Sequence, residues 1–222
     1  SFAGYWQFPQ AMPDQWVLLH WQSALQQVQT PIINSLSIAL VSTSVAVILT
    51  LLTLEYEKQN GSQLSNYSSL IIYLPMMIPS IAFLFGLVWL RETLHANATF
   101  INVSLAHLLF VLPYVFLSLA VSYRRLDPRY AQVAASLGAS PLKIFIQVSL
   151  PKLLIPILMA SALGLAVSFS QYLPTLLVGG GRLNTVTTEA VSLANGASRR
   201  TSAVYALIQM LLPAIAFSMI WL

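Results

Sequence analysis

Long apolar runs recur along this chain, and polar stretches that hold most of the charges separate them. A run of about 18 to 20 apolar residues is enough for a helix to cross the roughly 30 Å hydrocarbon layer of a membrane. The pattern therefore predicts an all-α, polytopic bundle of about five transmembrane helices. We expect these spans at Ile33–Leu54, Ser68–Leu90, Ile101–Ser122, Leu153–Leu173 and Ala203–Leu222.

Composition favours a membrane protein over a soluble one. Of the 222 residues, 57% are hydrophobic and only 7% are charged, whereas soluble domains average about 25% charged residues. So few charges cannot cover a water-soluble fold, and a soluble all-helical core is the alternative. The absence of cysteine excludes disulfides and thiolate metal sites. Because the chain opens at Ser1 on a polar and aromatic stretch, we expect a fragment of a longer polypeptide.

Basic residues set the expected orientation, because cytoplasmic loops of membrane proteins are enriched in Lys and Arg. We place the loop of residues 123–152 in the cytoplasm. Residues 33–222 then form the transmembrane domain, and an interfacial segment at 1–32 faces outward with the loops around Glu92 and Glu189. The cytoplasmic cations are Lys58, Arg124, Arg125, Arg129, Lys143 and Lys152, against Arg91, Arg182, Arg199 and Arg200 on the outer side.

Prolines and small residues inside the spans predict bends and close packing. A proline removes one backbone donor and can bend its helix, which applies to Pro75, Pro79, Pro113, Pro156 and Pro213. Small residues at four-residue spacing let a neighbouring helix approach closely. The fourth span carries such a stripe at Ala160, Gly164 and Ser168.

Residues 127–151 predict two short capped helices inside the cytoplasmic loop. Asp127 can cap the first helix with Pro128 at its first position, since the carboxylate accepts backbone donors and proline has no donor to leave unpaired. Gly138 favours the left-handed conformation that ends such a helix after Leu137.

The second helix of the loop repeats this start signal. Ser140 and Pro141 form the cap and first position, and Pro151 should end the helix. The first helix carries a small-residue face and the second an apolar face, made of Ala131, Ala134 and Ala135 and of Leu142, Ile144, Phe145 and Val148. These faces fit contact with a partner protein and equally fit a helix pair lying on the membrane surface.

The spacing in this loop resembles the cytoplasmic motif of type I ABC importer permeases. That motif reads E-A-A, three residues, G, nine residues, I or V, one residue and L-P, and its spacing matches from Gln132 to Pro151. Gln132 stands where the family usually has Glu, and Val133 where it usually has Ala. Gln132 can still form hydrogen bonds but lacks the charge for a charge-assisted pair.

A second stretch is similar to the thiamine and iron branch of this family. It contains Gln171-Tyr172-Leu173-Pro174, then three glycines with Arg182, and then Thr185 to Glu189. The family also places three spans before the loop and two after it when its first helix is left out. We therefore expect a missing upstream helix or a missing first half of a fused permease.

The resemblance implies a permease subunit, or half of a fused permease, that moves a thiamine-, iron- or polyamine-like solute across a bacterial inner membrane by alternating access. Its implied partners are ABC ATPase subunits, a second permease unit and an external solute-binding protein, with no nucleic acid. The loop would dock on the ATPase as a coupling helix. The residues that the motif assigns to docking are Asp127, Gln132, Val133, Ala134, Gly138, Ala139, Ser140, Pro141, Val148, Leu150 and Pro151.

The chain carries no nucleotide-binding motif. Gly179-Gly180-Gly181-Arg182 lacks the Lys-Ser/Thr pair of a phosphate-binding loop, and its glycines favour a tight outer turn. We expect no enzyme activity, metal or cofactor on this chain, with ATP and magnesium bound by the partner ATPase. The alternatives are a passive channel and a membrane-embedded enzyme using Glu189 and His107, although no zinc or nucleophile-elbow motif accompanies them.

Polar side chains within the spans predict the solute pathway, because burying them in lipid is costly. The candidates are His107, Ser168, Ser170 and Gln171. A structural interpretation stands beside each functional one. His107 can be a neutral imidazole bonded to a neighbouring helix, and the serines can bond to carbonyls of their own helix.

Overall fold

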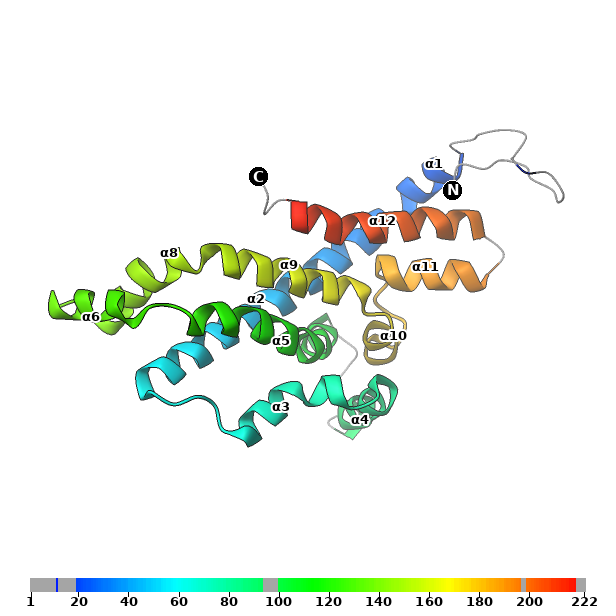
Figure 1. Ribbon diagram of the computed structural model, residues 1–222. Coiled ribbons are helices and arrows are strands. Elements are labelled where there is room, and N and C mark those ends of the chain that lie inside the picture. Colours follow the sequence, from blue (N-terminus) through cyan, green and yellow to red (C-terminus); the bar gives the residue numbers. More distant parts are fainter. Residues whose placement is uncertain (1–10, 12–18, 94–99, 197–198, 219–222) are drawn as a thin grey trace.

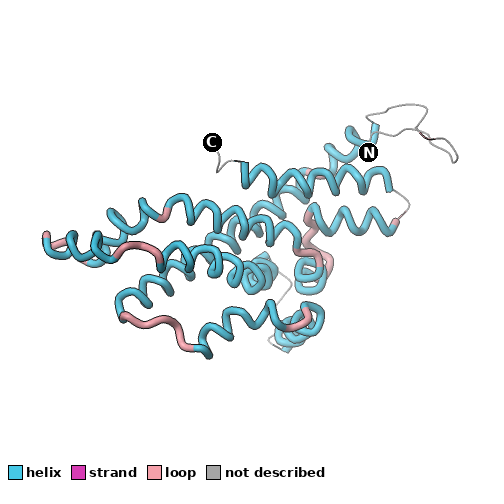
Figure 2. The backbone as a smooth tube through the Cα atoms, viewed as in Figure 1, coloured by secondary structure: helices cyan, strands magenta, loops and turns pink. Residues whose placement is uncertain are grey.

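The computed structural model describes residues 11, 19–93, 100–196 and 199–218, and these residues form helices and loops without strands (Figures 1 and 2). The helices are α1 (Leu19–Gln27), α2 (Gln29–Asn60), α3 (Asn66–Met77), α4 (Ser80–Thr93), α5 (Phe100–Arg124), α6 (Pro128–Ser136), α7 (Pro141–Ile144), a π-helical turn (Phe145–Ser149), α8 (Leu150–Lys152), α9 (Leu154–Ser170), α10 (Leu173–Gly179), α11 (Val186–Asn195) and α12 (Arg199–Ser218).

Three of these helices, α2, α5 and α12, are long and apolar enough to cross a membrane. Two bent pairs raise the count to as many as five. One pair is α3 with α4, bent by 105°, and the other is Pro141–Lys152 with α9, bent by 72°. The all-α, polytopic bundle expected from the hydrophobic pattern is therefore confirmed.

The second span, expected at Ser68–Leu90, is broken in its middle, next to Pro79, one of its two prolines expected to bend it. Helix α3 ends at Met77, and α4 begins at Ser80. Between them Ile78 is extended, with φ −89° and ψ 139°. The ring of Pro79 disfavours helical geometry at the residue before it and offers no backbone donor. Proline alone does not decide the outcome, because Pro75, Pro113 and Pro213 lie inside continuous helices.

The ends of two other spans differ from their predicted positions. Helix α2 begins at Gln29 rather than Ile33, so part of the expected interfacial segment is helical. Most of that segment, including Trp6 and Trp16, lies outside the described residues. Helix α9 ends at Ser170, because Gln171 is extended and the chain then turns into the short helix α10.

The core of the bundle lies where α2, α5 and α9 pack against one another. At Gly164, the backbone of α9 comes close to side chains of both other helices. A Cβ added there would lie 2.7 Å from Cγ2 of Thr43 in α2 and 3.0 Å from Cγ2 of Val115 in α5. Ala160 and Ser168 on the same stripe are buried. The predicted close approach along this small-residue face is thus confirmed.

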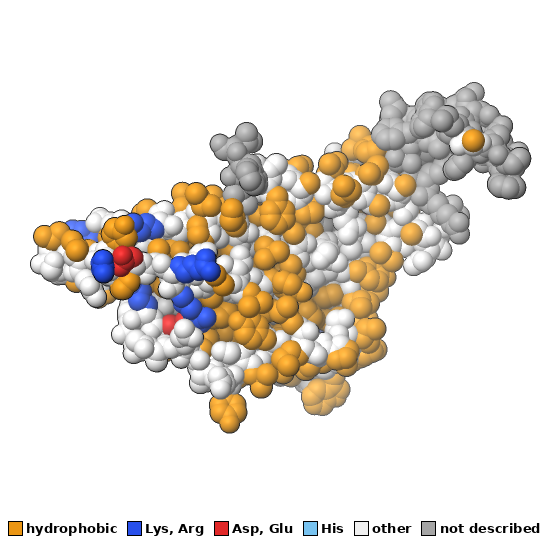
Figure 3. Space-filling model, in the orientation of Figure 1, with side chains coloured by type: hydrophobic (Ala, Val, Ile, Leu, Met, Phe, Trp, Pro, Cys, Tyr) orange, Lys and Arg blue, Asp and Glu red, His pale blue; other side chains and the backbone are white. Residues whose placement is uncertain are grey.

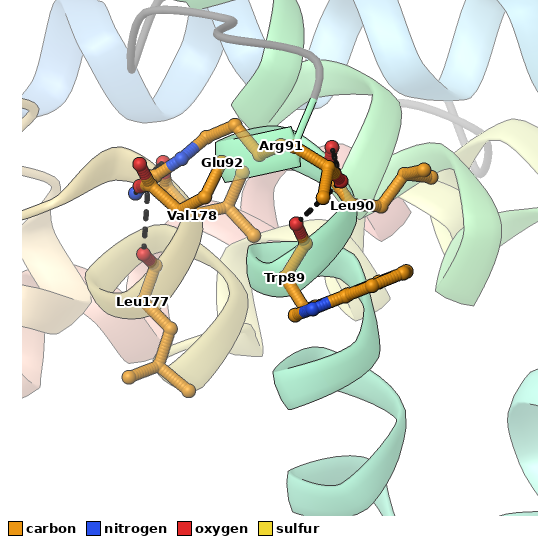
Figure 4. A network of polar contacts seen from close by, with 7 residues as sticks. Trp89, Leu90, Arg91, Glu92, Leu177 and Val178 are labelled. Carbon is orange, nitrogen blue, oxygen red and sulfur yellow. Dashed lines mark hydrogen bonds and ion pairs between the residues drawn. The ribbon is translucent and has the colours of Figure 1, made fainter.

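An arginine from α4 holds the end of the bundle that lies opposite the hairpin of residues 127–152 (Figure 1). The guanidinium of Arg91 donates to the carbonyl oxygens of Val178 at 2.6 Å and Leu177 at 3.5 Å in α10, and it pairs with the carboxylate of Glu92 (Figure 4). Carbonyls in the last turn of a helix lack helical partners and favour cations. Arg91 therefore fastens α4 to the C-terminal end of α10. Beyond it, Gly180 and Gly181 adopt positive φ angles and form the predicted outer turn.

Charge is distributed unevenly over the surface. On the face drawn in Figure 3, Lys, Arg and acidic side chains gather at the end formed by α6 to α8, and hydrophobic side chains cover much of the rest. Helix α11, which carries Glu189, lies at the opposite end (Figure 1). The hairpin and α11 therefore lie at opposite ends of the bundle (Figure 1).

Candidate functional site

The hairpin of residues 127–152 begins as its sequence predicts. The side chain of Asp127 accepts a hydrogen bond from the backbone N–H of Arg129 at 2.9 Å, and Pro128 occupies the first position of α6. The cap satisfies one of the backbone donors that have no partner inside the helix. Helix α6 therefore starts at a fixed point after α5.

Gly138 ends α6 in a left-handed conformation with φ of +80°. Its N–H donates to the carbonyl of Ala135 at 2.9 Å, and the N–H of Ala139 donates to that of Ala134 at 3.1 Å. These two bonds form a Schellman cap, which returns the chain sharply. A Cβ added to Gly138 would meet nothing within 4 Å. The glycine is therefore required for its backbone angle and not for space.

The second helix starts as predicted but does not end at Pro151. Ser140 accepts a hydrogen bond from the N–H of Lys143, and Pro141 opens α7. The backbone then shifts into a π-helical turn, in which Leu150 donates to Phe145. Pro151 lies in α8 directly after this turn, and the chain stays helical to Lys152.

The hairpin is packed loosely and presents apolar side chains to its surroundings. No residue of α6 or α7 is buried; α6 packs on α7 and the π-helical turn, and Nζ of Lys152 in α8 lies 3.4 Å from the centre of the Tyr130 ring in α6. Val133, Leu137 and Leu142 are 60%, 82% and 68% exposed. Gln132 is also exposed, and within the described chain its side chain makes no hydrogen bond. Exposed apolar groups in a charged region are typical of a contact surface.

The eleven predicted docking residues divide by exposure. Seven of them are exposed, namely Asp127, Gln132, Val133, Gly138, Ser140, Pro141 and Pro151. Four are half-buried, namely Ala134, Ala139, Val148 and Leu150. Val148 also lines a cavity of about 260 Å³ between the hairpin and the ends of α2 and α5. Tyr130 and Ala131 of the first helix line the same cavity, so both helices of the hairpin face the ends of α2 and α5.

An ion pair beside this cavity was not anticipated from the sequence. Glu57 in α2 is 6% exposed, and its carboxylate accepts three hydrogen bonds from Arg124 in α5 at 2.9 to 3.1 Å. It also accepts the backbone N–H of Leu64 at 2.8 Å. The available signal in the sequence was a pair of opposite charges, Glu57 and Arg124, at the ends of two predicted spans.

His107 and Ser168, two of the predicted pathway residues, meet inside the bundle. Nδ1 of His107 lies 2.8 Å from Oγ of Ser168, and Nε2 lies 2.8 Å from Oγ1 of Thr175 in α10. His107 is 2% exposed and Ser168 is 3% exposed. Both ring nitrogens therefore have partners in neighbouring helices, which is the structural interpretation of this histidine. Neither nitrogen is directed at Glu189, so the acid and base of the enzyme alternative are not paired.

Ser170 and Gln171, the other two candidates, lie at the end of α9. Gln171 donates to the carbonyl of His107 at 3.3 Å, whereas its buried Oε1 has no partner. Ser170 is exposed and donates to the carbonyl of Val167 in its own helix at 2.8 Å. The structure thus separates Ser170 from the buried group around His107.

Ser170 lines a groove between α9 and α12. A second polar residue of this groove was not among those expected from the sequence. The groove has a volume of about 240 Å³ and also contains Gln209. No hydrogen bond is formed by the Gln209 side chain in the described part of the chain. A glutamine inside an apolar span is itself a functional signal, and this signal was available in the sequence. The residues lining the groove are Ala166, Phe169, Ser170, Ala206, Gln209, Met210 and Pro213.

The chain is similar to permeases of known transport systems. It is 39% identical over 188 residues to the inner membrane ABC transporter permease protein YnjC of Escherichia coli, covering 85% of this chain and 35% of that protein. It is 30% identical over 173 residues to a spermidine/putrescine transport system permease protein PotC homolog of Mycoplasma genitalium, covering 75% of this chain and 60% of the relative.

A third relative is a putative 2-aminoethylphosphonate transport system permease protein PhnV of Salmonella typhimurium, 29% identical over 123 residues, or 54% of this chain and 46% of that protein. The chain spans less than two thirds of the length of each of these three relatives. A family model matches residues 50–222, a region that includes the whole hairpin. The chain therefore belongs to the family of binding-protein-dependent transport system inner membrane components.

Proposed function

We propose that this chain is a permease unit of an ATP-driven importer and that residues 127–152 dock on the ATPase. The observation that carries this proposal is the hairpin itself. It is capped at both helix starts, it turns at a left-handed glycine, and it presents unburied apolar side chains at the charged end of the bundle. The family membership and the motif spacing support the same role.

In this proposal the ATPase supplies all the nucleotide chemistry, including ATP and magnesium. Closure of two ATPase subunits would push on the hairpin, and the flanking helices α5 and α9 would rock between inward-open and outward-open arrangements. A second permease unit, either a separate subunit or the other half of a longer chain, would complete the pathway. A solute-binding protein would dock at the outer end, near α11, of this transporter in a bacterial inner membrane.

We infer that the solute is small and polar and passes along the groove between α9 and α12. The groove carries Ser170 and Gln209 and no charged side chain. The names of the relatives include a polyamine system and an aminophosphonate system, so they converge on a small amine-bearing solute without selecting one. Thiamine and iron stay predictions from the sequence resemblance.

Labelling of single cysteines tests the groove directly, because the native chain has no cysteine. In the assembled transporter, we expect Gln209→Cys to react with a membrane-impermeant methanethiosulfonate reagent. Leu211→Cys is the matched control, since Leu211 is 51% exposed on a face of α12 outside the groove. A reactive Leu211→Cys with an unreactive Gln209→Cys would exclude the groove as a water-filled path.

Gly138→Asp tests the docking role. We expect it to abolish retention of the ATPase subunit by the tagged permease, because aspartate is disfavoured at φ of +80° and places a charge in the contact. Gly61→Asp is the matched control, since Gly61 has φ of +63°, also has open space around its Cβ, and lies outside the hairpin. Equal retention in both variants, with vanadate-sensitive ATP hydrolysis intact, would contradict the proposal.

A further inference from the structure

Helix α2 is fastened by side chains at both of its ends, which lie on opposite sides of the bundle (Figure 1). The chain connects the hairpin directly to α5 and α9 but not to α2. Any force that the hairpin transmits to α2 must therefore pass through noncovalent contacts. They comprise the packing of α2 on α5 and α9 and a small number of polar contacts at the two ends of α2, which can be identified individually.

The inner end of α2 is joined to α5 and to the hairpin by charged groups. Glu57 holds Arg124 of α5 through the three hydrogen bonds described above, and the hydroxyl of Tyr123 donates to Glu55. Nζ of Lys58 donates to Oγ of Ser149 in the π-helical turn at 3.1 Å. Because ammonium groups form strong hydrogen bonds when partly shielded from water, Lys58 links α2 to the hairpin.

Ser149 differs from several serines that bond to carbonyls of their own helix. Ser35, Ser42 and Ser170, for example, each donate to a carbonyl three or four residues earlier in the same helix. Ser149 is 3% exposed and makes no such bond within the described chain; its partner is Lys58. The π-helical turn at Phe145–Ser149 thus directs a buried hydroxyl away from its own helix and toward α2.

Helix α2 is suited to transmit a displacement over its whole length. It runs for 32 residues without a break, which corresponds to about 48 Å at about 1.5 Å per residue. Its proline, Pro31, lies in the first turn, whereas α5 and α12 carry prolines in their interiors. The other crossing segments are bent pairs. A continuous helix moves as one rigid body more readily than a helix that contains a kink or a break.

The outer end of α2 is joined to the start of α11. The hydroxyl of Ser35 accepts the backbone N–H of Val186 at 3.0 Å in a buried contact. Nδ2 of Asn34 donates to the carbonyl of Asn184 at 2.9 Å. Ser35 thereby satisfies one of the free donors at the N-terminus of α11. Movement of α2 along its axis would displace this end of α11.

We propose that α2 connects the cytoplasmic hairpin to the outer helix α11, with Lys58 and Ser149 as its inner joint and Ser35 as its outer joint. Movement of the hairpin reaches α2 through Lys58 and reaches the start of α11 through Ser35. This inference rests on the proposed docking of an ATPase on the hairpin. Lys58, Ser149 and Ser35 are positioning residues, because none of them needs to touch solute or nucleotide.

Distances between spin labels test this connection without knowledge of the solute. One pair of introduced cysteines, Tyr56→Cys and Lys143→Cys, reports on α2 and the hairpin at the inner end. A second pair, Ile101→Cys and Ala194→Cys, reports on α5 and α11 at the outer end; all four positions are exposed. Each pair is measured in the transporter assembled with its ATPase, without nucleotide and after trapping with Mg-ATP and vanadate.

When Lys58, Ser149 and Ser35 are unchanged, we expect vanadate trapping to change the distance between the labels at 101 and 194. The distance between the labels at 56 and 143 should stay nearly constant. Lys58→Ala and Ser149→Ala should abolish the outer change and let the inner distance change instead. Ser35→Ala should abolish the outer change alone. Lys58→Arg and Ser149→Thr, which keep a donor and a hydroxyl, should behave as the native protein does.

Two results separate failure of this inference from failure of the proposed function. If the ATPase is retained and traps nucleotide, but the outer change is the same in Lys58→Ala and Ser35→Ala as in the native protein, the connection through α2 is overturned. If no ATPase is retained by the native permease, the docking role fails and the inference fails with it. Retained nucleotide trapping in the variants shows that they are folded.

Discussion

The hairpin of residues 127–152 and the group around His107 use polar residues in opposite ways. In the hairpin, Asp127 and Ser140 cap short helices whose side chains stay unburied. Around His107, the ring nitrogens bond to Ser168 and Thr175, and all three side chains are buried. The hairpin is thus capped at its helix ends and open on its surface, whereas the His107 group has few bonding positions left for a ligand.

This difference distinguishes exposed side chains, which are available for contact with a partner, from buried side chains, which stabilise the bundle. A buried polar group must be satisfied inside the protein, and an unsatisfied one costs about 1–3 kcal/mol. An exposed apolar side chain in a capped helix has no such internal function. Substitutions in the bundle should therefore reduce stability, and substitutions in the hairpin should reduce docking while leaving stability nearly unchanged.

The largest effect on stability is expected at Gly164. Gly164→Leu places side-chain atoms where Thr43 and Val115 already lie within 3.0 Å of an added Cβ. Overpacking of this kind costs about 3 kcal/mol at the upper end of the usual range, which a lower thermal unfolding midpoint in detergent would show. Gly86→Leu is the control, because nothing lies within 4 Å of its Cβ. Similar midpoints for the two variants would contradict close packing of α9.

A smaller loss of stability is expected for His107→Ala. The substitution removes two hydrogen bonds and leaves a cavity between α5, α9 and α10, which should lower the free energy of unfolding by about 2 kcal/mol. Ser170→Ala should change it by less than about 0.5 kcal/mol, since that hydroxyl is exposed. If His107→Ala keeps normal stability but changes solute uptake, His107 acts in the solute pathway and not in stabilising the bundle, which would contradict the comparison.

The smallest effect is expected at Gln132, within the hairpin. Gln132→Glu restores the acid usual in the motif, and a charge-assisted bond to the ATPase should strengthen docking by about 1 kcal/mol, or about fivefold in affinity. Titration of the ATPase against the permease in detergent would measure this. Gln147→Glu adds the same charge at another exposed position of the hairpin. A gain shared equally by both variants would indicate a general charge effect, and weaker binding by Gln132→Glu alone would show that the family contact is absent.

The capped helices and the spans were predictable because their signals are local. Asp127-Pro128 and Ser140-Pro141 satisfy backbone groups within their own first turns, and Gly138 sets its own φ angle. Apolar runs identify spans by length alone. The breaks were harder to predict, since the chain bends at Pro79 but stays helical through Pro113. Whether a proline bends a helix depends on neighbours that satisfy the freed carbonyl, and those neighbours are distant in sequence.

Sequence alone determined the class of this protein, the positions of its apolar segments and the two capped helices of residues 127–151, because hydrophobic length and helix caps act within a few residues. Tertiary structure alone decided that His107 meets Ser168 and Thr175, that Glu57 meets Arg124, and that Lys58 meets Ser149. The partners in these pairs lie more than sixty residues apart along the chain. Only the packing of α2, α5 and α9 brings them within hydrogen-bonding distance, and so it decides which polar side chains remain free to act.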